Sequence, residues 1–86
     1  MREIEETIKQ ILINNFGVSK LVADQYLGEP LTGSLFALRG RDMVYLLMLV
    51  EKEFSILLTE KDIVDYRFNS IEDITKCILS HSQVSY

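Results

Sequence analysis

The feature that most constrains this chain is an uninterrupted run of eight apolar residues, from Met43 to Val50. Charged residues close it on both sides, with Arg-Gly-Arg-Asp at 39–42 and Glu-Lys-Glu at 51–53. A membrane-spanning helix needs about 20 apolar residues, so the run is far too short to cross a bilayer. It is long enough for more than two turns of helix. A single helix of a small domain cannot bury apolar side chains all round, so one side must face solvent or a partner.

The spacing predicts a helix from about Arg41 or Asp42 to Phe54, with Asp42 in the first turn where the helix dipole favours negative charge. Its inward stripe is Met43, Leu46, Leu47, Val50 and Phe54. The flanking side chains are Val44, Tyr45 and Met48. Two arrangements are open for that flank: the preceding loop covers it, or it forms a partner surface.

An amphipathic helix is predicted before this run, over residues 2–16, ending at Gly17 in a left-handed cap. Its apolar face consists of Ile4, Ile8, Ile11, Leu12 and Phe16. In residues 18–40 the apolar residues do not recur at a regular helical spacing. This segment also contains three glycines and the only proline, which indicates a long loop. Within the loop we expect a turn or two of helix at 21–27. We also expect four anchors on the core: Leu31, Leu35, Phe36 and Leu38.

Two further helices follow the apolar run. Thr59 and Asp62 resemble a capping box that opens a short helix to about Asp65, with Ile63 and Val64 inward. Ser70 is placed to cap the last helix, whose inward stripe is Ile71, Ile74, Cys77 and Ile78. Residues 80–86 are expected to fray. The sequence therefore predicts one all-α domain over 1–86, a bundle of three main helices plus one short helix with a long first loop.

Composition excludes several classes of function. The net charge is −4 and the nine Lys and Arg residues are scattered, which argues against nucleic-acid binding. The single Cys77 has no internal disulfide partner, and no apolar stretch follows a basic amino terminus. We therefore expect a cytoplasmic protein with no membrane association.

Candidates for catalysis and metal binding are few. No nucleophile and base can be named together, so we expect no enzyme and no catalytic residue. His81 follows Cys77 by four residues, which would supply two metal ligands, but the sequence shows no further ligand cluster for a metal site. We therefore predict no metal site and a core position for Cys77.

The order and spacing of the segments resemble the acyl carrier protein family over nearly the whole chain. Four segments carry the resemblance: the opening helix through Phe16-Gly17-Val18, Val44 with 46–48, 50–54 followed by Ile56, and the segment 68–78. The resemblance implies an acyl-carrier-like bundle whose second main helix recognises partner enzymes. It also implies a phosphopantetheine arm on the serine of an Asp-Ser-Leu motif at the start of that helix.

This chain departs from the family at that serine, which corresponds to Gly40, fourteen residues before Phe54. Arg39-Gly40-Arg41 stands in place of Asp-Ser-Leu, and glycine has no hydroxyl to carry a phosphodiester. We therefore expect no cofactor. The alternative is a genuine acyl or peptidyl carrier of fatty-acid, polyketide or peptide biosynthesis. Such a carrier would bear phosphopantetheine on Ser34, or would have been mutated at the attachment site.

The resemblance is strongest to acyl-carrier-related proteins of bacterial, notably clostridial, peptide-maturation systems. It rests on Leu31-Thr32-Gly33, Phe36, Asp42, 44–47 and Glu51-Lys52. It implies a carrier-like module that docks on a biosynthetic or maturation enzyme through the second main helix. The expected docking residues are Arg39, Arg41, Val44, Tyr45, Met48 and Lys52. A dimerisation domain that hides Tyr45 and Met48 against a second copy is a further alternative, although we expect a monomer rather than a homodimer.

Overall fold

The computed structural model describes residues 2–84, which form five helices and no strand. The helices are α1 (Arg2–Phe16), α2 (Lys20–Gln25), α3 (Gly40–Phe54), α4 (Glu60–Tyr66) and α5 (Ile71–Val84). The all-α prediction is confirmed. The expected turn or two of helix at 21–27 is confirmed by α2, so the molecule has two short helices where the predicted bundle counted one.

Helix α2 is too short to be stable alone, and contacts with α1 hold it in place. Ser19 Oγ accepts a hydrogen bond from the N–H of Val22 and caps its start. Ala23 is fully buried. Lys9 of α1 extends to Asp24 at 3.4 Å and to Glu6 at 3.2 Å. Burial acts to lower the pKa of Lys9, but the two carboxylates outweigh it and the pKa is raised, so this nearly buried amine stays charged.

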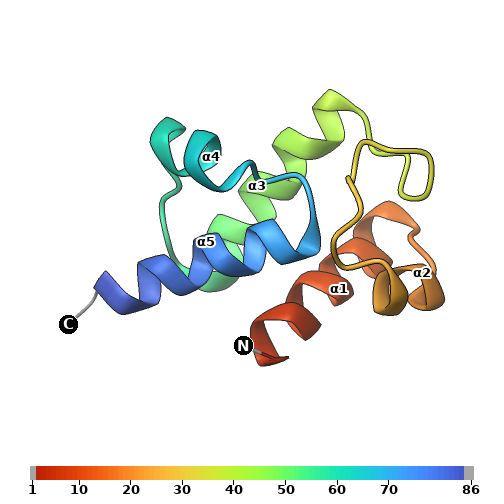
Figure 1. Cartoon of the computed structure of the whole chain (residues 1–86), viewed down its shortest axis with the longest axis horizontal. Coiled ribbons are helices and arrows are strands. Elements are labelled where there is room, and N and C mark those ends of the chain that lie inside the picture. Colours follow the sequence, from red (N-terminus) through yellow and green to blue (C-terminus); the bar gives the residue numbers. More distant parts are fainter. Residues whose placement is uncertain (1, 85–86) are drawn as a thin grey trace.

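Helix α1 packs against α2, α3 and α5, and α4 packs against α5. Figure 1 shows α4 lying over α5 at one end of the molecule and α2 beside the end of α1 at the other. The predicted stripes of α1 and α5 meet in the core, and Gly17 has the left-handed φ of 69° expected of a cap. The fully buried large side chains are Ile8, Leu12, Leu31, Leu46, Val50, Ile71, Ile74, Thr75, Cys77 and Ile78.

The loop between α2 and α3 is fastened to the bundle by backbone hydrogen bonds. The N–H of Leu31 donates to the carbonyl of Asn69 at 2.9 Å, and that of Leu38 donates back to Leu31 at 3.0 Å. Leu31, Phe36 and Leu38 are buried as predicted, but Leu35 is exposed. Residues 33–37 close a tight turn, from the N–H of Ala37 to the carbonyl of Gly33, and Leu35 lies on its outer side.

Two predictions for the last third of the chain are wrong. Val64 is 70% exposed, because only the Ile63 side of α4 is turned toward the core. Helix α5 continues to Val84 instead of fraying at residue 80. His81 lies 3.0 Å from Asp62 of α4, which gives this extra turn a tertiary contact. Ser85 and Tyr86, also expected to fray, lie outside the described residues. No helix in the described part is long and apolar enough to cross a membrane.

Candidate functional site

Helix α3 has one face in the core and another open to solvent. Leu46 and Val50 are fully buried, whereas Val44 is 59% exposed and Met48 58% exposed. The loop before α3 therefore does not cover this flank, so the first of the two arrangements considered from the sequence is wrong. Tyr45 is also exposed, but its ring meets that of Phe16 edge to face, with 5.6 Å between centroids and 63° between planes.

The exposed flank of α3 continues into the segment that follows the helix. Ser55 ends α3 in a left-handed conformation, with φ of 54°. Glu51 then fastens the segment, because its carbonyl accepts from the N–H of Ile56 at 3.1 Å and its Oε2 accepts from the N–H of Leu58 at 2.8 Å. Leu57, between these two bonds, is 81% exposed. Leu57 was not among the residues predicted from the sequence, although its place in the apolar triplet 56–58, shortly after a helix end, was a usable signal.

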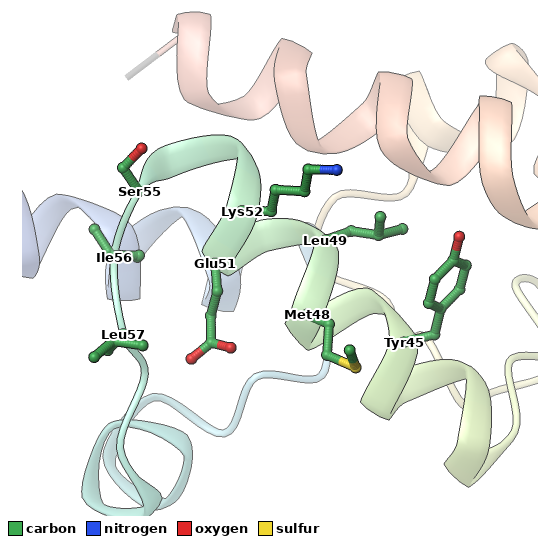
Figure 2. A pocket seen from close by; sticks show the side chains of 8 residues that line it. All are labelled: Tyr45, Met48, Leu49, Glu51, Lys52, Ser55, Ile56 and Leu57. Carbon is green, nitrogen blue, oxygen red and sulfur yellow. The ribbon is translucent and has the colours of Figure 1, made fainter.

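A hollow of about 680 Å³ lies between this segment and α3. Figure 2 shows the side chain of Leu57 on one side, those of Met48 and Glu51 in the middle, and Tyr45 at the far side. The residues that line the hollow are Tyr45, Met48, Leu49, Glu51, Lys52, Ser55, Ile56 and Leu57. The hollow is thus mainly apolar, with one acid and one base among its walls.

The predicted docking residues divide into three groups. Tyr45, Met48 and Lys52 line this one hollow. Val44 lines a second hollow, of about 350 Å³, together with Met43, Leu47 and residues of α4 and of the segment after it. Arg39 and Arg41 line neither hollow; both are exposed at the amino-terminal end of α3.

That end of α3 is where the attachment serine was expected and Gly40 stands. Gly40 is the first residue of the helix, and Asp42 Oδ2 accepts from the N–H of Arg39 at 2.9 Å. Gly40 is exposed, and a Cβ added there would have no heavy atom within 4 Å other than those of its chain neighbours and the backbone of its own helix. A side chain at this position would therefore project into open space. Ser34, the alternative attachment residue, is also exposed, in the turn at 33–37.

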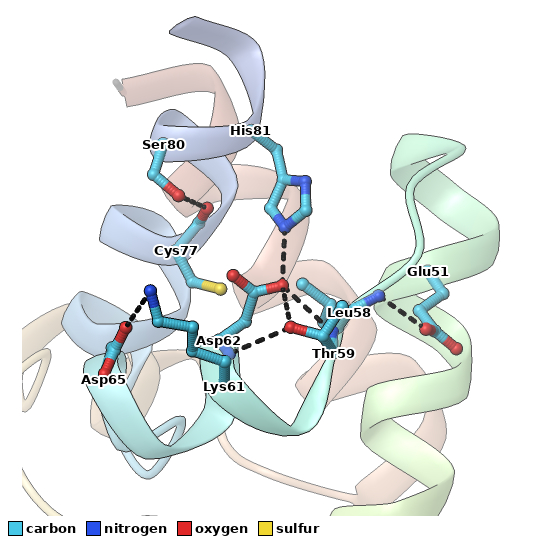
Figure 3. Close-up of polar contacts among 9 residues, drawn as sticks. All are labelled: Glu51, Leu58, Thr59, Lys61, Asp62, Asp65, Cys77, Ser80 and His81. Carbon is cyan, nitrogen blue, oxygen red and sulfur yellow. Dashed lines mark hydrogen bonds and ion pairs between the residues drawn. The ribbon is translucent and has the colours of Figure 1, made fainter. Parts of the chain in front are cut away.

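A separate cluster of side chains that could bind a metal ion lies where α4 meets α5. The ligand atoms of Asp62, Cys77 and His81 all lie within 4.8 Å of one another. Figure 3 shows them facing each other, with Asp62 on α4 and the other two on α5. The prediction that no third ligand accompanies Cys77 and His81 is therefore wrong. Asp62 was recognised only as a capping residue, because its distance from α5 in sequence concealed the contact.

The environment of this cluster shifts two pKa values in opposite directions. The N–H of Thr59 lowers the pKa of Asp62 most; burial opposes this, and the contact with His81 lowers it further. Burial and, to a smaller extent, the charge of Asp62 raise the pKa of the Cys77 thiol to about 11. Cys77 is fully buried, which confirms its predicted core position.

Comparison with known proteins adds no relatives. No family model matches the chain, and no curated protein or solved structure is significantly similar to it.

Proposed function

We propose that this protein is an acyl-carrier-like docking module that carries no phosphopantetheine at Gly40 and binds a biosynthetic enzyme, of the peptide-maturation class, through α3. The observation that carries the proposal is the exposed apolar flank of α3, which continues past the helix end to Leu57. Large apolar side chains grouped on a surface mark interaction sites more often than chance exposure does.

The position of Gly40 supports the carrier-like part of the proposal. In the acyl carrier protein family, which this chain resembles, the serine that carries phosphopantetheine stands at the start of the recognition helix. Gly40 likewise begins α3, at an exposed point with free space around it. The sequence therefore lacks the hydroxyl at a position that has room for an attached arm. We therefore favour recognition without cargo for this surface.

The composition of the flank suits a protein partner. Tyr45 and Met48 belong to residue types enriched in interface centres, and Leu57 adds a third anchor. Lys52 lies beside them, and Arg39 and Arg41 are exposed at the other end of α3. We therefore expect a partner with an apolar pocket for the anchors and acidic groups facing the three cations.

The docking test uses Met48→Asp and Leu57→Asp, with binding to a peptide-maturation enzyme of the same organism measured by calorimetric titration. Each change places a charge in the centre of the proposed interface, so the affinity is expected to fall at least about tenfold, equal to about 1.4 kcal/mol. The matched control is Val64→Asp, which also charges an exposed apolar residue but on α4 outside the hollow. Equal weakening by all three variants contradicts the proposal.

The carrier alternative is tested with a phosphopantetheinyl transferase and coenzyme A. We expect no mass gain on the native chain. A gain of one phosphopantetheine group that Ser34→Ala abolishes would identify Ser34 as the attachment residue. Replacing Arg39-Gly40-Arg41 by Asp-Ser-Leu is expected to create a modified protein, because the added hydroxyl has free space around it.

The dimerisation alternative draws on the same exposed flank, since an apolar face also suits a second copy. Sedimentation over a hundredfold range of concentration is expected to give the monomer mass throughout. A dimer that Met48→Asp dissociates would favour self-association over docking.

A further inference from the structure

We propose that Asp62, Cys77 and His81 form a binding site for a transition-metal dication of the zinc class, which joins α4 to α5. The three residues come from two helices and bring one carboxylate, one thiol and one imidazole together. This site is independent of the docking flank, because none of the three residues lines the hollow beside α3.

The spacing of the ligand atoms is close to what a tetrahedral ion needs. Zinc bonds of about 2.0 to 2.3 Å place neighbouring donors roughly 3.5 Å apart. Here all three donors lie within 4.8 Å of one another, and Asp62 Oδ2 is 3.0 Å from His81 Nε2. Side-chain shifts of about 1 Å would therefore complete three coordination bonds, with water in the fourth position.

The backbone and neighbouring residues hold the ligands in place. Cys77 and His81 are four residues apart on α5, so their side chains lie on one face of the helix. Asp62 Oδ2 accepts hydrogen bonds from Thr59, from its N–H at 2.9 Å and from its hydroxyl at 3.0 Å. Such bonds to a ligating carboxylate orient it toward the ion.

The site is accessible from one side. The Asp62 and His81 side chains are 21% and 26% exposed, whereas Cys77 is fully buried beneath them. An ion would enter between the carboxylate and the imidazole and reach the sulfur last. On binding, the Sγ–H bond breaks, the proton leaves to solvent and the thiolate coordinates the metal, with no change of oxidation state.

The ligand types select the class of ion. Thiolate and imidazole suit zinc and similar transition metals, whereas magnesium and calcium prefer sites made of oxygen alone. The competing explanation is that Asp62 and His81 form only an ion pair and Cys77 only fills the core. The two explanations differ in whether the sulfur coordinates metal, and this can be measured directly.

The decisive experiment is a titration of the reduced, tag-free protein with Co²⁺, which reports its ligands through absorption. Binding at this site is expected to reach one ion per chain, to produce thiolate-to-cobalt charge-transfer absorption and to be reversed by Zn²⁺. Cys77→Ala is expected to abolish the absorption while circular dichroism shows that the helices remain. Absence of the absorption in the native protein overturns the proposal.

The other two ligands are tested by His81→Gln and Asp62→Asn, whose amides preserve hydrogen bonding between the helices. Each is expected to weaken Co²⁺ binding at least about 100-fold, the upper end of what losing an outer-shell partner costs. Asp65→Asn is the matched control, because Asp65 lies on α4 outside the cluster, and is expected to change nothing. Unchanged affinity in His81→Gln, or an equal loss in Asp65→Asn, contradicts the proposal.

A stability readout completes the test. At a concentration about 100-fold above its Kd, Zn²⁺ is expected to raise the Tm of the native protein by roughly 10 to 20 °C, since it binds the folded state. The same addition is expected to raise the Tm of His81→Gln by only a small fraction of that shift, because its roughly 100-fold weaker site is at most about half occupied. A rise of equal size in both proteins would show that zinc binds elsewhere.

Discussion

The two faces of α3 differ in burial although they share one run of apolar residues. Leu46 and Val50 have no exposed surface, while Val44 and Met48, each two residues from a buried neighbour, are more than half exposed. Hydrophobicity is similar on both faces, so it cannot decide which of them is core. The helical period decides it, because α1 packs against one side of α3 while the side chains on the other side stay about half exposed.

This difference separates residues needed for folding from residues available for recognition. Leu46 and Val50 of the inner face are fully buried, whereas Val44, Tyr45 and Met48 of the outer face remain 47% to 59% exposed. The docking proposed above would cover these exposed apolar residues. Substitutions on the two faces should therefore differ in their effect on the free energy of unfolding, and four predictions test that separation.

The largest effect is expected for Leu46→Ala on the inner face. Because Leu46 is fully buried, its truncation should lower the free energy of unfolding by about 2 to 5 kcal/mol. Met48→Ala, the matched truncation on the outer face, should change it by less than about 0.5 kcal/mol. Urea denaturation followed by circular dichroism measures both. Similar losses in the two variants would remove the distinction between the faces.

The next effect concerns Glu51, which fastens the segment carrying Leu57. Its carboxylate accepts from the part-buried N–H of Leu58 at 2.8 Å, and Glu51→Ala leaves that donor without its partner. We expect a loss of about 1.5 kcal/mol, the usual size for a hydrogen bond to a charged group. Glu51→Gln retains an acceptor and should lose clearly less in the same denaturation assay. If the two variants behave alike, the hydrogen bond does not hold the segment.

Tyr45 lies at the boundary between the two faces, exposed but in edge contact with Phe16. Tyr45→Ala should therefore lower the free energy of unfolding by about 1 kcal/mol, within the range of aromatic pairs. Tyr45→Phe keeps the ring and should stay near the native value. A loss above about 3 kcal/mol in thermal or urea unfolding would place Tyr45 in the core and remove it from the docking surface.

The features that the sequence predicted correctly are those set by neighbouring residues. The cap at Gly17, the Thr59 and Asp62 capping box and the Ser70 cap are all present. The helical period also identified Leu46 and Val50 as core. Each of these features depends on residues within one or two helical turns, which a sequence pattern samples directly.

The features that were missed depend on contacts between distant segments. Leu35 and Val64 have apolar side chains, but only the arrangement of the loop and of α4 shows that they face outward. Asp62 and Cys77 are fifteen residues apart, and no local pattern indicates that α4 lies against the last turns of α5. For the same reason the length of α5 was underestimated, since the contact between His81 and Asp62 extends it.

The smallest effect is expected for Gly40→Ser at the tip of α3. The first helical position is exposed and an added Cβ has free space, so the free energy of unfolding should change by less than about 0.5 kcal/mol. Gly40→Ala controls for the added carbon without the hydroxyl and should match it in urea denaturation. Docking affinity should also stay within threefold in both variants, because Gly40 lies outside the hollow lined by Met48 and Leu57. A large loss of affinity in both variants would mean that the partner packs directly against the backbone at Gly40, between the contacts proposed for Arg39 and Arg41.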